Sequence, residues 1–539
     1  MGRGVYTDKE CNNGKPNHKF NANPHQTHVV DHFLKSNNKG LLLYHKLGSG
    51  KTCTSIMVAD ALINADMVDM VYVLTPGSLR ENWIFEYCNT CGFSSSFIKK
   101  NFTFITYNFD VAPSLNRLNF NRSLVIIDEV HNLINGVKNM SKNAYAIYTK
   151  IMDSNCRVLA LSGTPVFAFS CEWSLLGNML KPGRFPTIFS GGGTNKNLWD
   201  SCAVSDKSLR GLVSYYPGDT KYYPEVIYHP PILCSMGDDQ YEQYQNSVEW
   251  EIKTRTQGPP PESLKRKNPS KYWKKHAQFM IAVKWIVSRK ASNFYYPDGE
   301  MIPFDSTESP DSLHEDMETE TMKDFKPDLL APEGWFYPQY LDDARLATYY
   351  SPKFTALLIN IGLRLDTKHA VFTFFKTRAG ITMIHTLLTK CGIPSAVYSG
   401  DMNDRERASV LKRYNDVRNR NGDIIKVLLI TDAGAEGITL LEVNNVHILE
   451  SSTRENKIRQ SIGRAVRYKS HWYMPDDRRY VNVWRYWSVP PGGIAIETEA
   501  SPMQSVDQYL YRKGIENVEE LDKFSKRLAD NSIENFPEK

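Results

Sequence analysis

The sequence has 539 residues, far more than one hydrophobic core usually organises, so we expect two or more domains. Hydrophobic residues make up 41% of the chain and charged residues 23%, as in an ordinary soluble globular protein. No stretch reaches the roughly 18 consecutive apolar residues of a membrane span, and no signal-peptide core follows the N-terminus. We therefore expect neither a membrane partner nor secretion. The net charge of +5 permits a polyanionic partner without establishing one.

The 9 cysteines are scattered along the chain. An odd, dispersed set in a long chain is typical of free thiols in a reducing compartment, not of a disulfide framework. Cys88 and Cys91 form a single CxxC motif, but no second Cys or His pair lies nearby to complete a zinc site. The sequence therefore predicts unpaired cysteines and no structural zinc.

A glycine-rich turn lies between a short apolar run and an apolar-periodic segment. Residues 41–44 suit a buried strand, and residues 52–62 carry apolar side chains at helical spacing. In this setting the backbone N–H groups of the turn and the helix N-terminus converge on phosphates. A tight turn without a ligand is the alternative, but the coincidence of strand, glycines, Lys-Thr and helix favours a phosphate-binding loop.

The loop supplies a nucleotide-binding set. Lys51 would reach the β- and γ-phosphate oxygens, and Thr52 would ligate Mg²⁺. The usual pattern has glycine at position 45, where this chain has His45. The predicted nucleotide contacts here are Gly48, Ser49, Gly50, Lys51 and Thr52.

Two adjacent carboxylates follow a second apolar strand. Residues 124–127 are apolar, and Asp128 and Glu129 come directly after them. Asp128 would hold the Mg²⁺ shell, and Glu129 would orient and deprotonate the attacking water. Because neighbouring residues of an extended strand point opposite ways, we expect this pair where the strand ends and the chain turns.

These motifs, taken in chain order, resemble those of superfamily 2 helicases and translocases. The matching segments are residues 48–52, 128–131 (Asp-Glu-Val-His), 161–165 (Leu-Ser-Gly-Thr-Pro), 430–438 and 460–467 (Gln-Ser-Ile-Gly-Arg-Ala-Val-Arg). The resemblance implies an ATP hydrolase that uses ATP and Mg²⁺ and binds nucleic acid. It also assigns nucleotide contacts to Gly434, Glu436 and Gly437.

The family's fold is α/β, with two RecA-like parallel-sheet lobes. Alternating strands and helices between residues 370 and 430 independently predict a parallel sheet covered on both faces. The expected divisions are 1–205 (first lobe), 206–348 (mainly helical or irregular insertion), 349–500 (second lobe) and 501–539 (helical extension packed on the second lobe). Within the insertion, the acidic stretch 305–324 predicts a mobile loop.

Gln460, Arg464 and Arg467 fall at separations of four and three residues, which on a helix places them on one face. Such a face could close across the lobe interface, where the two arginines would neutralise charge that develops in the transition state. A solvated basic face is the alternative. Upstream, Gln26 matches a position at which similar motors read the adenine edge, although an ordinary helix-capping turn is an open alternative.

Several short segments resemble narrower groups within the superfamily. Similarity to Swi/Snf-like duplex translocases is found in residues 162–165, 73–76, 79–83 and 351–353. Residues 42–45, 211–216 and 505–510 resemble ATPases of large cytoplasmic DNA viruses, namely the early transcription factor small subunit and nucleoside triphosphate phosphohydrolase I. This resemblance implies duplex DNA as the track, a viral RNA polymerase or a second transcription-factor subunit as partner, and action in the cytoplasmic viral factory or the virion.

The insertion also carries a basic-aromatic segment. Residues 265–267 are Lys-Arg-Lys, and residues 271–275 are Lys-Tyr-Trp-Lys-Lys. Such residues can hold phosphates and stack on bases, or they can form a solvated helix.

For the whole chain, the sequence favours a nucleic-acid translocase. The alternatives are an ATP-binding structural or promoter-recognition subunit and a strand-separating helicase.

Overall fold

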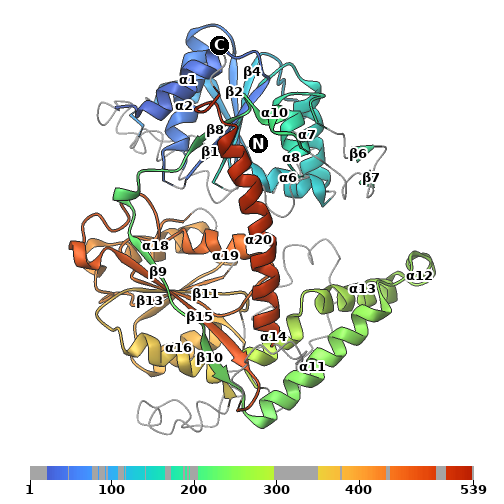
Figure 1. Ribbon diagram of the computed structural model, residues 1–539, viewed down its shortest axis with the longest axis vertical. Coiled ribbons are helices and arrows are strands. Elements are labelled where there is room, and N and C mark those ends of the chain that lie inside the picture. Colours follow the sequence, from blue (N-terminus) through green and yellow to red (C-terminus); the bar gives the residue numbers. More distant parts are fainter. Residues whose placement is uncertain are drawn as a thin grey trace. The chain divides into compact units, whose positions relative to one another are not determined.

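Figure 1 shows the computed structural model of the chain, which divides into two units. The first lobe comprises Met1–Lys221 and Asn517–Lys539, and the second lobe comprises Tyr222–Glu516. The structure describes residues 21–46, 48–75, 83, 91–92, 95–106, 115, 117–139, 141–163, 172–185, 189–190, 193–194, 204–295, 350–376, 379–431, 438–492 and 505–536. The acidic stretch 305–324 lies outside these residues.

The first lobe is built on a parallel six-stranded sheet. Every pair of neighbouring strands in it is parallel. In spatial order the strands are β3 (Phe102–Thr106), β2 (Met70–Thr75), β4 (Ser123–Ile127), β5 (Arg157–Ser162), β1 (Gly40–His45) and β8 (Val213–Tyr216).

Alternate side chains of these strands enter two separate apolar cores. On β1, Leu42 belongs to one core, while Leu41 and Leu43 belong to the other. This alternation follows from the two-residue period of a strand, and it shows that helices cover both faces. The helices are α1 (Pro24–Lys35), α2 (Lys51–Asn64), α4 (Ser95–Asn101), α6 (Val130–Lys138), α7 (Lys142–Asp153), α8 (Glu172–Leu180) and α10 (Asp206–Leu209), and a short hairpin joins β6 (Phe189–Ser190) to β7 (Gly193–Thr194).

The second lobe contains a seven-stranded parallel sheet. Its main path is β10 (Ile232–Ser235), β15 (Tyr480–Val489), β14 (Asn445–Ile448), β11 (His369–Thr373), β13 (Val427–Thr431) and β12 (Ser395–Tyr398), and β9 (Glu225–Tyr228) also pairs with β15. The helices are α11 (Asp238–Gln257), α12 (Glu262–Lys267), α13 (Pro269–Val283), α14 (Ile286–Asn293), α16 (Pro352–Gly362), α17 (Ile381–Lys390), α18 (Asp404–Tyr414) and α19 (Glu455–Ile462). Two parallel sheets with flanking helices confirm the predicted α/β fold of two RecA-like lobes.

Three strands lie in the range where the sequence predicted a helical or irregular insertion. β8 extends the first sheet, and β9 and β10 both pair with β15 of the second. The helical part of the range begins at α11. None of the helices in the described part of the chain has the length and apolar character that crossing a bilayer requires.

The C-terminal helix α20 (Val506–Asp530) begins in the second lobe and continues into the first. Leu521, Phe524 and Leu528 are buried in a core of the first lobe. Beyond the helix, the Ile533 N–H donates to the Val213 carbonyl at 2.8 Å. The expectation that the tail packs on the second lobe is therefore wrong from residue 517 onward. An apolar stripe on a helix shows that it packs, but not against which partner.

A buried ion pair joins α16 to the start of α20 within the second lobe. Lys353 and Asp507 are 0% and 1% exposed, and their side-chain nitrogen and oxygen lie 2.7 Å apart. Lys353 Nζ also donates to Asn293 Oδ1, and the Ser488 N–H donates to Asp507 Oδ2. Since each charge has hydrogen-bonded compensation, removing one partner alone leaves the other charge uncompensated.

We predict that Lys353→Met lowers the free energy of unfolding by about 3–5 kcal/mol, because the Asp507 carboxylate stays buried without its cation. Urea unfolding followed by tryptophan fluorescence measures the change. The double variant Lys353→Met/Asp507→Asn should lose less than the sum of the two single variants. A loss below about 1 kcal/mol for Lys353→Met would contradict the prediction.

Candidate nucleotide-binding site

Three neighbouring strands of the first lobe bring the predicted motifs to one edge of the sheet. β5 pairs with both β1 and β4, and all three are parallel. Their carboxyl ends therefore meet at the same edge, where open parallel sheets bind ligands. The glycine-rich loop follows β1, Ser162 ends β5, and Asp128 follows β4. The glycine-rich loop thus shares one site with segments more than 70 residues away along the chain.

The loop after β1 has the backbone of a phosphate-binding turn. Gly48 and Gly50 adopt φ angles of 81° and 83°. In this region the backbone is strained for any residue that carries a side chain. A Cβ atom at Gly50 would also lie 2.8 Å from Gln26 Nε2. α2 begins at Lys51, so the positive end of the helix dipole lies at the loop. Lys51 Nζ donates to the His45 carbonyl at 2.9 Å.

The two carboxylates lie at the turn predicted from the sequence. β4 ends at Ile127, and the Asp128 N–H donates to the Leu74 carbonyl at 2.8 Å. Glu129 adopts a left-handed conformation, with φ 47° and ψ 57°, directly before α6. This conformation is uncommon for a non-glycine residue and recurs at functional sites. It breaks the alternation of a strand, so adjacent carboxylates need not point to opposite faces.

Glu129 is connected to the end of β5 through a buried histidine. His131 Nδ1 lies 3.4 Å from Glu129 Oε2 and 3.3 Å from Ser162 Oγ. His131 is 7% exposed, so water screens these contacts little. The proposed base and the third motif are therefore held in one polar cluster. Thr164 and Pro165 lie outside the described residues.

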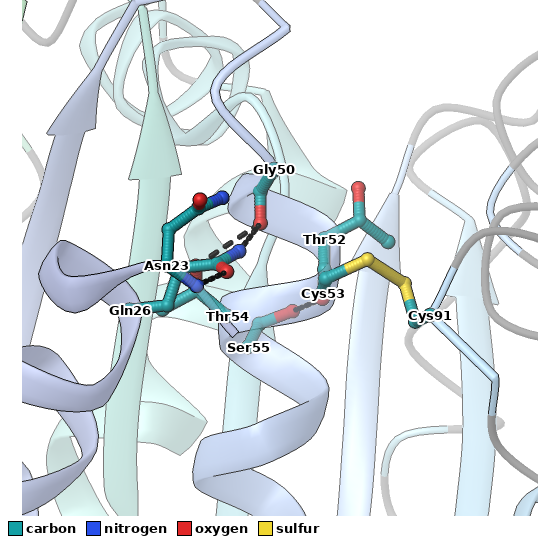
Figure 2. The surroundings of a disulfide bond; sticks show 8 residues. All are labelled: Asn23, Gln26, Gly50, Thr52, Cys53, Thr54, Ser55 and Cys91. Carbon is teal, nitrogen blue, oxygen red and sulfur yellow. Dashed lines mark hydrogen bonds between the residues drawn. A yellow bond between two sulfur atoms is a disulfide. The ribbon is translucent and has the colours of Figure 1, made fainter. Parts of the chain in front are cut away.

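Gln26 is engaged at both ends of its side-chain amide. Its Oε1 accepts the Asn23 N–H at 2.8 Å, and its Nε2 donates to the Gly50 carbonyl at 3.3 Å, as Figure 2 shows. The first contact is the helix-capping arrangement that the sequence left as an alternative. The second ties the start of α1 to the phosphate-binding loop. Adenine recognition by Gln26 stays a prediction.

A polar chain that the sequence analysis missed reaches this loop from the C-terminal end. Glu534 Oε1 accepts the Ser214 hydroxyl at 2.6 Å, and Glu534 Oε2 accepts the Tyr215 N–H at 2.9 Å. Ser214 Oγ in turn lies 2.9 Å from His45 Nε2. Because the single hydroxyl proton goes to the carboxylate, His45 must donate its Nε2–H to the serine oxygen.

Two histidines beside the loop have lowered pKa values. Burial, reinforced by nearby Lys51, lowers the pKa of His45 well below its usual value. Burial also lowers the pKa of His25, whose ring stacks on Tyr216 with centroids 3.8 Å apart. His25 Nε2 lies 3.2 Å from the Ser49 carbonyl, so this stack lines the loop. No local pattern could have revealed the hydrogen bond between Ser214 and Glu534, since the two residues are 320 positions apart along the chain.

A disulfide anchors the first turn of α2. Cys53, two residues after Lys51, is bonded to Cys91. In Figure 2 the bond lies on one side of the helix start and Gln26 on the other. The prediction that all cysteines are free is therefore wrong for this pair, although Cys156, Cys234 and Cys391 are free. Both bonded residues lie in one apolar core, and spacing along the chain does not reveal such proximity.

In the second lobe, the expected arginine helix is shorter than the spacing suggested. α19 ends at Ile462, Arg464 lies in the turn that follows, and Arg467 lies beyond that turn. The prediction that one continuous helical face carries Gln460 and both arginines is therefore wrong. The Arg464 carbonyl accepts the Leu440 N–H at 2.9 Å, so a tertiary hydrogen bond is made where the helix would have continued.

The arginines remain close to the other motif of this lobe. Arg467 Nη1 donates to Thr439 Oγ1 at 2.8 Å, and Arg464 is 6% exposed. Thr439 follows the segment 430–438, of which residues 432–437, including Gly434, Glu436 and Gly437, lie outside the described residues. Gln460 lies in the last turn of α19 and is half-buried.

Comparison with known proteins identifies the two lobes. Residues 353–469 match the helicase conserved C-terminal domain, and residues 19–167 match the type III restriction enzyme res subunit. These matches support a superfamily 2 helicase-type ATPase. Both matches include motifs placed above at the sheet edges.

The relatives of this helicase-type ATPase include several viral proteins. A protein of Acanthamoeba polyphaga mimivirus named as an ATP-dependent RNA helicase is 26% identical, over 85% of this chain and 80% of its own. Nucleoside triphosphatase I of Choristoneura fumiferana entomopoxvirus is 26% identical, over 83% and 70%. The termination factor NPH-I homolog of African swine fever virus is 25% identical, over 89% and 74%. The chain thus resembles viral transcription ATPases, as its short motifs predicted.

We predict that Glu534→Ala raises the KM of this ATPase for ATP several-fold with little change in kcat. The Ser214 hydroxyl and Tyr215 N–H would lose their acceptor, which should also cost about 1 kcal/mol of unfolding free energy. Steady-state hydrolysis assays give both constants. Glu520→Ala removes an exposed carboxylate from α20 and serves as the control. A KM equal to that of the wild type would contradict a positioning role for Glu534.

Reduction of the disulfide should lower the unfolding free energy of the first lobe by about 4 kcal/mol, because Cys53 and Cys91 close a loop with a sequence separation of 38 residues. Urea unfolding with and without a phosphine reductant tests this. Cys91→Ala should be insensitive to the reductant. Equal transitions for the wild type under both conditions would show that the bond does not stabilise the lobe.

Proposed function

We propose that this helicase-type ATPase is a translocase that moves along duplex DNA during viral transcription, in early initiation or in termination. The family supports the coarser statement that the chain hydrolyses ATP and moves along nucleic acid. The observation that carries the proposal is the carboxylate turn after β4. Glu129, in its left-handed conformation, stands at the same sheet edge as the phosphate-binding loop.

The site fits a nucleotide and its metal ion. The loop of Gly48 and Gly50 allows close approach of phosphates, which a side chain at either glycine would hinder. Thr52 and Asp128 would hold Mg²⁺, which neutralises phosphate charge when bound. Lys51 would contact the β- and γ-phosphates. Glu129 would take the proton of the attacking water, and His131 would hold the carboxylate in place.

In the proposed cycle, the second lobe responds to the nucleotide. Arg464 and Arg467 would supply positive charge to the γ-phosphate in a closed state, and hydrolysis would reopen the lobes. The link from Arg467 to Thr439 couples these arginines to the segment after β13. Within each lobe, loops near strand-end threonines would hold and release a nucleic-acid backbone. Thr75 and Thr106 end β2 and β3, and Thr431 ends β13.

Duplex DNA is favoured over RNA by the Ser162-Gly163-Thr164-Pro165 motif, which resembles the Swi/Snf-like branch. A strand-separating helicase is the second candidate, and the RNA helicase name of the mimivirus relative favours it. A purely structural or promoter-recognition subunit is the third. The strained turn at Glu129 argues against it, because a site used only to bind nucleotide has no need of such a residue.

The proposed setting is the cytoplasmic viral factory or the virion, beside a viral RNA polymerase or a second transcription-factor subunit. The transcription-related name of the African swine fever virus relative supports this partner class. A reducing cytoplasm would act on the Cys53–Cys91 bond. The stability of the first lobe would then depend on the redox state of its surroundings.

We predict that duplex DNA stimulates ATP hydrolysis by the full chain more strongly than single-stranded DNA or RNA does. Lys51→Ala should abolish turnover and provides the blank. Glu129→Gln should bind ATP normally but hydrolyse it about 10²- to 10⁴-fold more slowly, because the base is lost. Steady-state phosphate release with each nucleic acid measures all three proteins.

The outcomes separate the candidates. Stimulation by RNA alone would favour the RNA helicase, and hydrolysis indifferent to every nucleic acid would favour the structural subunit. Triplex displacement without strand separation would support translocation over unwinding. Near-wild-type hydrolysis by Glu129→Gln would show that another residue is the base.

A further inference from the structure

Charge is segregated along the helical segment between β10 and α14. Residues 238–251 hold five acidic residues and no lysine or arginine. Residues 253–275 hold eight basic residues and one acidic residue, a net charge of +7. The whole chain carries +5, so all other residues together carry −2. The net positive charge of this protein therefore comes from one short segment.

This segment forms the outer part of a two-helix arm. α11 and α13 pack against each other, and α12 joins them at the tip, as Figure 1 shows in green. The root of the arm is where α11 packs on α14. Near the root, Glu251 is buried, and its carboxylate accepts the Val287 N–H at 2.7 Å and the Ser288 hydroxyl at 2.6 Å. The acidic residues thus lie on the part of α11 that leads from the root, and six of the eight basic residues lie on α12 and α13.

Most basic side chains at the tip are exposed and form no ion pair within the described part of the chain. In the described part of the chain, no carboxylate forms an ion pair with Arg266, Lys267, Lys271, Lys274 or Lys275, all of which are exposed. The one acidic residue of the tip is Glu262. It lies 3.8 Å from Lys265 Nζ and accepts the Tyr272 hydroxyl at 2.8 Å. An array of five unneutralised cations in this small region costs repulsion unless a polyanion covers it.

The array has a regular geometry on α13. Lys271, Lys274 and Lys275 are separated by three and four residues in one helix, so they share a face. The α12 residues continue the charge at the tip, next to the N-terminus of α13. Such a basic stripe along a helix is the electrostatic footprint of a nucleic-acid backbone.

The aromatic rings at the tip are covered by other side chains and do not offer open faces on which bases could stack. Tyr272 is 5% exposed, and Lys265 Nζ lies over the rings of both Tyr272 and Trp273, at 5.5 Å and 4.9 Å from their centroids. These rings hold the arm together instead of presenting open faces to bases. Of the two functions that the sequence suggested for this segment, the structure therefore favours phosphate contact over base stacking.

We propose that the tip of the α11–α13 arm is a second nucleic-acid contact of the motor, which binds the phosphate backbone without reading sequence. The proposal rests on the translocase function proposed above. A contact outside the strand-end loops would keep the motor on its track while those loops release it. The partner class is a nucleic-acid duplex, and an acidic protein surface is the outcome that the test must separate.

The test compares the full chain with the triple variant Lys271→Gln/Lys274→Gln/Lys275→Gln. Binding to a fluorescent DNA duplex is measured by anisotropy over a range of salt concentrations. We expect the triple variant to bind more weakly at low salt. The slope of log K against the logarithm of the salt concentration should be smaller in magnitude by about 2 to 3, since each phosphate contact contributes about 0.9 to it. The side chains are exposed, so the thermal transition should be unchanged.

The matched control is Lys35→Gln/Lys523→Gln/Lys526→Gln, which removes the same charge from exposed positions in the first lobe. It should retain nearly the wild-type affinity and slope. Equal losses in the two triple variants would overturn the proposal, because net charge alone would explain them. An arm variant that binds DNA as the wild type does would also overturn it.

Polyglutamate as a competitor separates the two partner classes. If the arm variant loses affinity for polyglutamate as strongly as for DNA, the tip is a surface that binds acidic proteins, and the proposal fails.

The translocase function and the arm contact can also fail separately. DNA binding that depends on the arm, without any stimulation of ATP hydrolysis, would overturn the translocase and leave the contact standing. If DNA stimulates ATP hydrolysis but the arm variant binds DNA as the wild type does, the translocase stands and the arm contact is overturned.

Discussion

The parallel pairing of β4, β5 and β1 is the constraint on which the candidate site depends. Parallel strands end at a common edge, so residues after each strand must meet there. This brings the phosphate-binding loop, the carboxylate turn and Ser162 together without any local sequence relation among them. The turn at Glu129 then adds what the sheet alone cannot supply, because its left-handed backbone re-aims a side chain that a continuing strand would have alternated.

Around this edge, hydrogen bonds and a disulfide hold the phosphate-binding loop and the residues beside it. Gln26 holds the Gly50 carbonyl, the disulfide anchors the first turn of α2, and Glu534 reaches His45 through Ser214. The uncharged state of His45 avoids a second cation beside Lys51. A loop held from three sides has less freedom to lose when a nucleotide binds, which is the general advantage of preorganisation.

Charge is handled differently in the second lobe. Inside it, Lys353 and Asp507 are fully buried but compensated, so they add positional specificity without an exposed field. At the tip of the arm, the opposite arrangement holds, with several cations exposed and unneutralised. A compensated buried pair organises the fold, whereas an uncompensated exposed array attracts a polyanion. The two cases show why a count of lysines alone says little about function.

By itself, the sequence determined the two α/β lobes, the phosphate-binding loop and the carboxylate pair, because strand and helix periods and glycine requirements act over a few neighbouring residues. The alternation of strands and helices predicted between residues 370 and 430 is found for the same reason, as β11, α17, β12, α18 and β13. Only the tertiary structure decided the Cys53–Cys91 bond, the Glu534–Ser214–His45 chain, the lobe that receives Leu521 and Phe524, and the end of α19 before Arg464. Each of these depends on residues that are distant in sequence and adjacent in space, and in the last case the Leu440 hydrogen bond replaces a helical one. Local patterns carry no information about such partners, because only tertiary packing brings them together.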